Sequence, residues 1–129
     1  MSSVLRFEVP LPPPEARGNN KPQNDGQRHA KNQALETYAA QFGYMAIDAR
    51  NRSDNPAAWR KLPTAHMTLT FVFPDHRRRD IDNYKAAFKG AQDKLVSCGI
   101  LLDDSWEHLS TTEVARCEKG VSKVIVEVK

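Results

Sequence analysis

Alternation of apolar and polar residues predicts strands with one buried face in two places along this chain. The first is Ser3 to Val9, which ends at a run of prolines because proline removes a donor from a sheet ladder. The second is Ala65 to Phe73, where large apolar residues alternate with histidine and threonine. Two further strands, at about 109–118 and 121–128, flank a turn at 119–120.

Two other segments repeat apolar residues at three- and four-residue spacing, which is typical of a helix with one buried face. The first begins at Ala30 and is broken by turn residues at 51–56. The second runs from Ile81 to Ser97, and Gly99 follows it at a position that favours left-handed backbone. The predicted buried faces consist of Leu35, Tyr38, Phe42, Met45 and Ala49 in the first helix and of Ile81, Tyr84, Phe88, Ala91 and Leu95 in the second.

The element order β-α-β-α-β-β predicts an α+β fold. We expect a small single domain of residues 1–129, with two main helices packed on one face of a mixed β-sheet. A length of 129 residues suits one domain, and 40% hydrophobic residues suffice for a single, modest core.

Composition narrows the function only a little. The net charge of +3 permits a nucleic-acid partner without requiring one. No apolar run is long enough for a signal peptide or a membrane span, so we expect a cytoplasmic protein with no membrane partner. Cys98 and Cys117 are spaced for neither a metal site nor a disulfide framework, and we expect both to be small buried apolar residues in a reducing compartment.

A segment rich in glycine, asparagine and glutamine separates the prolines from the first predicted helix. It spans residues 15–29 and is expected to be an open loop that carries Arg17, Lys21 and Arg28 against Asp25. Two interpretations stay open, a solvated connection and an arm that contacts DNA.

The run Arg-Arg-Arg-Asp-Ile-Asp-Asn at 77–83 is the most informative part of the chain. Its two carboxylates, Asp80 and Asp82, fall where the second strand passes into the second helix. Charge pairing accounts for any single arginine–aspartate pair, and an acid in the first helical turn also suits the helix dipole. Magnesium offers a further explanation, because it takes oxygen ligands and allows a nuclease to neutralise phosphate charge and activate water. The arginines would then grip neighbouring phosphates.

A second acidic pair, Asp103 and Asp104, follows the second predicted helix. A helix of about seventeen residues is roughly 25 Å long. Asp104 therefore meets Asp80 only if the chain doubles back along the helix or if a second subunit completes the site, and spacing does not choose between the two. A plain turn before the next strand is the simpler alternative.

The segment from Arg77 to Asp104, RRRDIDNYKAAFKGAQDKLVSCGILLDD, resembles the RusA-type Holliday-junction resolvases, a family of crossover junction endodeoxyribonucleases common in phages and prophages. A weaker likeness lies in VPLPPP of the first strand. The resemblance implies a homodimer that cuts four-way junction DNA by paired symmetrical nicks, in DNA recombination and repair.

The resemblance also implies roles for individual residues. Asp80, Asp82 and Asp104 would bind the catalytic Mg²⁺ or, in its place, Mn²⁺, while Asp103 and Asn83 would support these ligands without binding the ion themselves. Arg77, Arg78, Arg79 and Lys85 would contact DNA.

The family has an essential lysine on the intervening helix, and here the sequence departs from the best-known pattern. That pattern places lysine four residues after the second acid, where this chain has Ala86. Counting back from Gly99 selects Lys89, and so does rotation along one continuous helix, which brings Lys89 to almost the same face as Asp82. Nearness to Asp82 would select Lys85. We expect Lys89 to be the catalytic lysine.

Two other functions stay open. One is a less selective metal-dependent nuclease of branched DNA, and the other is a non-catalytic junction-binding protein. Phe88 is expected in the core instead of at a junction crossover, and Trp106 is the better of the two tryptophans as an interface residue.

Overall fold

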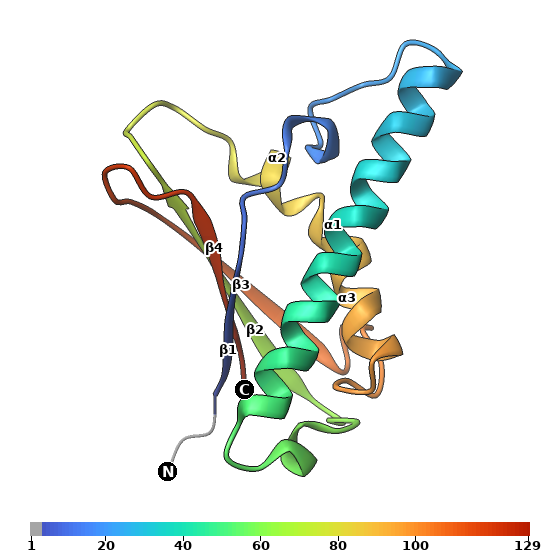
Figure 1. Cartoon of the computed structure of the whole chain (residues 1–129), viewed down its shortest axis with the longest axis vertical. Helices are drawn as coiled ribbons and strands as arrows, with labels where there is room; N and C mark the ends of the chain where they lie inside the picture. The colour runs from blue at the N-terminus through green and yellow to red at the C-terminus, as the bar shows by residue number, and fades with distance from the viewer. Residues whose placement is uncertain (1–3) are drawn as a thin grey trace.

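The computed structural model describes residues 4–129, so the first residue of the strand predicted from Ser3 lies outside the described part. One four-stranded sheet is covered on one face by helices (Figure 1). The strands are β1 (Leu5–Val9), β2 (Ala65–Phe73), β3 (Leu109–Cys117) and β4 (Lys123–Val128). The helices are α1 (Asp25–Arg52), α2 (Ile81–Lys85) and α3 (Phe88–Ser97), with short 3-10 helices η1 (Pro14–Ala16) and η2 (Pro56–Trp59). This confirms the predicted α+β class and element order.

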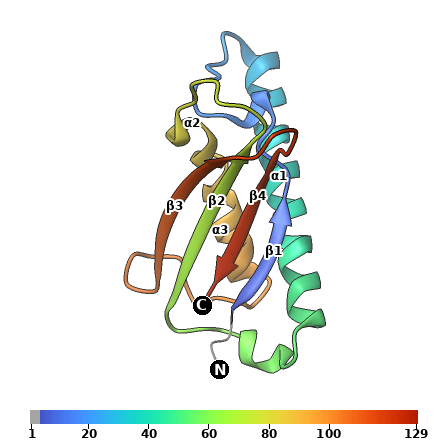
Figure 2. The same cartoon turned by 90° about the vertical axis from the view of Figure 1, so that its left-hand side faces the viewer.

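The sheet has the strand order β1-β4-β2-β3 (Figure 2). β4 runs antiparallel to both β1 and β2, whereas β2 and β3 are parallel. The strands on either side of the turn at 119–120 therefore lie on opposite sides of β2 and do not pair with each other. Because β2 and β3 are parallel, the residues after β2 leave at the end of the sheet opposite to that where the chain enters β3.

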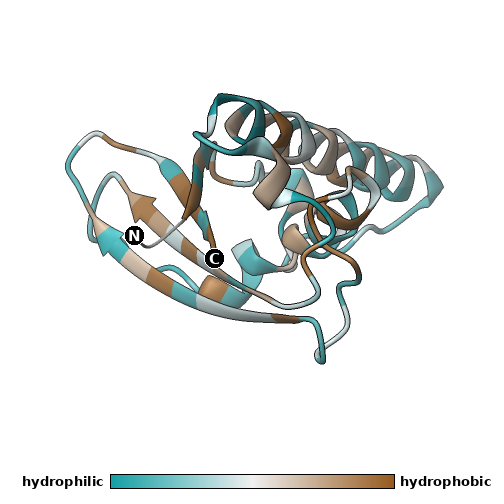
Figure 3. Cartoon of the chain, turned by 90° about the horizontal axis from the view of Figure 1, so that it is seen from below, coloured by the Kyte–Doolittle hydropathy of each residue, from teal (hydrophilic) through white to brown (hydrophobic). Residues whose placement is uncertain are grey.

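The core lies between the sheet and the helices. Along the strands, apolar and polar residues alternate as bands of brown and teal (Figure 3). Phe88 is fully buried, as predicted, and its ring meets those of Tyr38, Phe42 and Phe71 edge-on. Trp59 is also buried, whereas Trp106 is 85% exposed. Aromatic packing of this kind fixes α3 over β2 and so sets the position of every polar residue on its outer side.

Helix α1 begins earlier than the sequence pattern predicted. The prediction of a loop up to residue 29 was wrong, because the side chain of Asn24 accepts a hydrogen bond from Gln27 N at 2.9 Å and caps a helix that starts at Asp25. The carboxylate of Asp25 in the first turn also stabilises this start through the helix dipole. The first turns therefore form a helix without the apolar stripe from which the later turns were predicted. The helix ends at Arg52, within the predicted break.

The second predicted helix is divided. α2 ends at Lys85 and α3 begins at Phe88, with Ala86 and Ala87 between them in helical backbone conformation but outside either regular helix. The apolar spacing of residues 81–97 does not reveal this break, because both helices bury residues of the same stripe.

Two further predictions concern the cysteines and the membrane. Cys98 and Cys117 are free thiols, but each is only half-buried. Within residues 4–129, no helix combines the length and the apolar character that crossing a bilayer requires.

Candidate active site and nucleic-acid interface

The connection from β2 to α2 is held by Asp75. Its carboxylate accepts a hydrogen bond from Arg77 N at 3.0 Å and pairs with the Arg79 guanidinium at 2.9 Å. The hydrogen bond from the backbone N–H of Arg77, together with the one from the side chain of Arg79, keeps the pKa of Asp75 below its usual value. The Arg79 guanidinium also stacks on the Phe73 ring, 4.7 Å from its centroid, and its side chain is only 9% exposed. Arg79 therefore stabilises this connection through its ion pair and its stacking on Phe73.

Asp80 and Asp82 lie at the start of α2, as predicted. Asp80 is the N-cap residue, and its Oδ1 accepts a hydrogen bond from Asp82 N at 3.0 Å. Asp82 occupies the first turn, and both residues are exposed. The capping role therefore coexists with a carboxylate pair that solvent, a metal ion or a phosphate can reach.

A polar hollow of about 320 Å³ opens beside these acids. It is lined by Arg17, Asn19, Arg77, Arg78, Arg79, Asp80, Asn83 and Tyr84. The run at 77–83 supplies most of this lining, as its composition suggested. Arg17 comes from the segment after η1, and sequence reasoning did not place it with the other arginines. Its sequence signal was a basic residue on the segment 15–29, for which an arm that contacts DNA was one of two open interpretations.

Lys85, at the end of α2, forms an ion pair across to the sheet. Its Nζ lies 2.7 Å from Oε1 of Glu113 on β3, and Thr111 Oγ1 donates a hydrogen bond to the same oxygen at 3.2 Å. The Glu113 side chain is 21% exposed. Glu113 was not predicted as a site residue. Its sequence signal was an acidic side chain on the face of a strand that packs against the helices.

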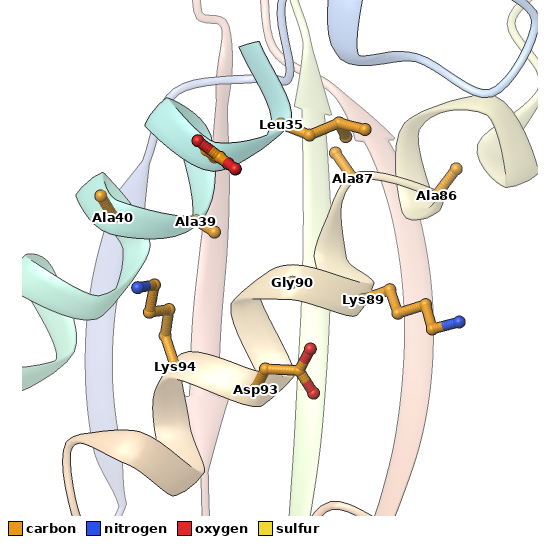
Figure 4. A pocket seen from close by; sticks show the side chains of 10 residues that line it. Leu35, Ala39, Ala40, Ala86, Ala87, Lys89, Gly90, Asp93 and Lys94 are labelled. Atoms are coloured by element: carbon orange, nitrogen blue, oxygen red, sulfur yellow. The ribbon is translucent and has the colours of Figure 1, made fainter. Parts of the chain in front are cut away.

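Lys89 lies beyond the helix break, on α3. It lines a hollow of about 720 Å³ between α1 and α3, and its side chain points to the same side of α3 as that of Asp93, away from Lys94 (Figure 4). Asp82 and Lys89 do not lie on one continuous helix, because α2 and α3 are separate, so the prediction that rotation brings them to almost the same face was wrong. The expectation for Lys89 then depends only on the resemblance, whose pattern was counted back from Gly99.

Asp104 lies against α3 instead of against the start of α2. A hydrogen bond with the Asp93 carboxyl, together with partial burial and repulsion from Asp93, raises the pKa of Asp104. The backbone N–H of Asp104, 2.8 Å away, lowers the pKa of Asp103. The candidate acids of one chain thus form two groups, Asp80 with Asp82 and Asp93 with Asp104.

No triplet of acidic, histidine or cysteine residues in the described range 4–129 gathers closely enough to hold one metal ion. Asp80 and Asp82 together supply the oxygen donors that Mg²⁺ prefers, and Asp104 with Asp93 supplies a second such pair. Each pair has the type of donor atom that the ion takes, and neither pair has a third such side chain close by among residues 4–129.

Neither family models nor curated proteins matched this chain. The resemblance in residues 77–104 therefore depends on the sequence motif alone.

Proposed function

We propose that this chain is a magnesium-dependent, structure-specific endodeoxyribonuclease that resolves four-way DNA junctions as a homodimer. The observation that supports this most is the start of α2, where the exposed carboxylate of Asp80, two residues before exposed Asp82, lines a hollow together with four arginines. Carboxylates hold hard cations, and guanidinium groups bind phosphates through paired hydrogen bonds. A phosphodiester is a substrate that suits both kinds of group side by side.

In this proposal Asp80, Asp82 and Asp104 hold the metal ion, which neutralises phosphate charge and supplies an activated water when bound. Asp80 is fixed by its capping hydrogen bond, so one carboxylate is held in place before any ligand arrives. Arg77 and Arg78 hold the DNA strand by its phosphates. Lys89, which forms no ion pair among the described residues, stabilises charge that develops on the reacting phosphate.

The separation of the acids bears on the homodimer. Within one chain Asp104 lies against Asp93, so we propose that the partner subunit supplies Asp104 to the Asp80–Asp82 pair. A two-fold axis then relates two such sites, which suits paired nicks in the two equivalent strands of a four-way junction. Trp106, exposed two residues after Asp104, is proposed as part of this interface.

The proposal is tested by incubating the protein with a synthetic four-way junction, a flap and a linear duplex, with and without Mg²⁺. Paired symmetrical nicks on the junction alone, dependent on the metal, are expected. Asp80→Asn should abolish them, and Asp54→Asn, at an exposed aspartate outside both acidic groups, should not. Cutting of all three substrates would support a less selective nuclease, and binding without cutting would support a non-catalytic junction-binding protein.

A further inference from the structure

The segment that follows η1 is fixed to α2 by several contacts. Gly18 N donates a hydrogen bond to Asn83 O at 2.8 Å, and Lys31 Nζ of α1 donates to Arg17 O at 3.3 Å. Gly18 packs so closely that an added Cβ would lie 3.1 Å from the Cβ of Ala86. This segment is therefore a docked element beside Asp80 and Asp82, not a free arm.

The docking holds the Arg17 guanidinium in one orientation. Its Nε donates to Pro12 O at 3.0 Å, and its Cζ lies 4.6 Å from the centroid of the Tyr84 ring. Stacking on an aromatic ring and one hydrogen bond leave the two terminal amino groups of a guanidinium available for a planar, bidentate ligand. Among residues 4–129, no hydrogen bond or ion pair is found for these two groups of Arg17.

The hollow carries a strong excess of positive charge. Four arginines line it against one carboxylate, that of Asp80. Arg79 is already paired with Asp75, whereas the side chains of Arg17, Arg77 and Arg78 have no ion pair within the described part of the chain. Three guanidinium groups without an ion-pair partner around a small polar hollow favour binding of an anion, and phosphate matches their fork geometry.

We propose that this hollow binds one phosphate group of the DNA backbone, with Arg17 as its fixed anchor. Arg77 and Arg78 complete the contacts, and the bound phosphate lies next to the one at the Asp80–Asp82 pair. The choice of DNA as the source of the phosphate rests on the proposed function, but binding of the anion by this hollow does not.

The first experiment measures junction affinity at several salt concentrations, with Ca²⁺ in place of Mg²⁺ to prevent cutting. Arg17→Gln should weaken binding about tenfold and reduce the salt slope by about one, because a charged bidentate contact is lost. Arg17→Lys should keep the slope and lose part of the affinity. The matched control is Arg28→Gln, since Arg28 is an exposed arginine of α1 paired with Asp25, and it should change affinity by less than about twofold. Equal effects of Arg17→Gln and Arg28→Gln would overturn the proposal.

The second experiment separates this inference from the proposed function. Inorganic phosphate is titrated in EDTA while the Nε–H signals of the arginines are followed by NMR. Shifts at Arg17 but not at Arg28 support the anion site even if the protein cuts no DNA. Shifts at neither residue overturn it. If phosphate shifts the Arg17 signal but Arg17→Gln keeps full junction affinity, the DNA backbone is not the ligand. The hollow is then a site for free phosphate.

Discussion

The ammonium of Lys85 lies 2.7 Å from the carboxylate of Glu113, and this ion pair joins the end of α2 to the edge strand β3. Glu113 is aligned with Leu69 of β2, so it belongs to the face of the sheet that the helices cover. Lys85 thus has a protein partner close to Asp82, whereas Lys89 accompanies Asp93 on α3. The two candidate lysines therefore lie in different places: Lys85 is paired with β3, and Lys89 lines the hollow between α1 and α3.

The first prediction concerns the rate of cutting. Lys89→Ala should lower the single-turnover rate on a four-way junction by at least about tenfold, because the Lys89 ammonium has no ion pair among residues 4–129 and is proposed to stabilise phosphate charge. Lys85→Ala should have a smaller effect, since Glu113 already engages that lysine. Rapid-quench assays at saturating Mg²⁺ measure both, with unfolding curves as a control for folding. A larger loss in Lys85→Ala would reassign the catalytic role to Lys85.

The second prediction concerns stability. Lys85→Met should lower the free energy of unfolding by up to about 1 kcal/mol, because the mostly buried carboxylate of Glu113 loses its partner while Lys85 is itself half exposed to solvent. Urea denaturation of Lys85→Met, Glu113→Gln and the double variant forms the cycle that measures the coupling. Additive effects of the two changes would show that the ion pair contributes nothing measurable.

The third prediction concerns the assembly of the metal site. Asp80→Asn and Asp104→Asn should each abolish cutting and preserve junction binding, because each removes a negative ligand from a phosphate-facing site. If the partner supplies Asp104, a mixed dimer of the two variants keeps one intact site. Mixing them should then restore nicking of one strand of a plasmid-borne cruciform. No restoration in mixed dimers, verified by differently tagged subunits, would place the whole site within one chain.

The fourth prediction concerns Gly18. Gly18→Ala should destabilise the fold by about 1 kcal/mol, because the added methyl group lies 3.1 Å from the Ala86 Cβ and forces the docked segment away from α2. It should also weaken DNA binding by displacing Arg17. Gly26→Ala is the control, because a Cβ added there meets only Asn24 Oδ1, at 3.4 Å. Alanine favours a helix more than glycine does, so this change should stabilise the fold by about 0.5 kcal/mol. Thermal unfolding of both variants decides the matter, and similar changes in the two would exclude close packing at Gly18.

The fifth prediction concerns pH. The hydrogen bond with Asp93 raises the pKa of Asp104 in the folded chain, so the folded state binds its proton more tightly than the unfolded state. This contribution to stability is complete below about pH 4 and is lost as the pH rises through the folded-state pKa. Asp93→Asn should therefore raise the melting temperature at pH 7 in EDTA. The gain should shrink in acid, and Asp54→Asn should show neither effect. An equal gain at pH 3.5 and pH 7 would argue against a carboxylate pair.

Much of the fold follows from local patterns. Apolar residues alternate along Ala65–Phe73 and recur at helical spacing in α1 and α3. Each pattern shows which side of its segment must be buried, so the type and order of the elements were predictable. The position of Asp80 and Asp82 at the start of α2 was predictable for the same reason, because a capping residue is recognised from its immediate neighbours.

Only the tertiary structure decided which distant residues meet. The register of β2 with β3 brings Glu113 to Lys85, and docking of Gly18 on Asn83 brings Arg17 to the arginines at 77–79. The return of the chain after α3 places Asp104 against Asp93. Each of these contacts joins segments far apart in sequence, and their pairing depends on strand order and helix packing, which no local periodicity encodes.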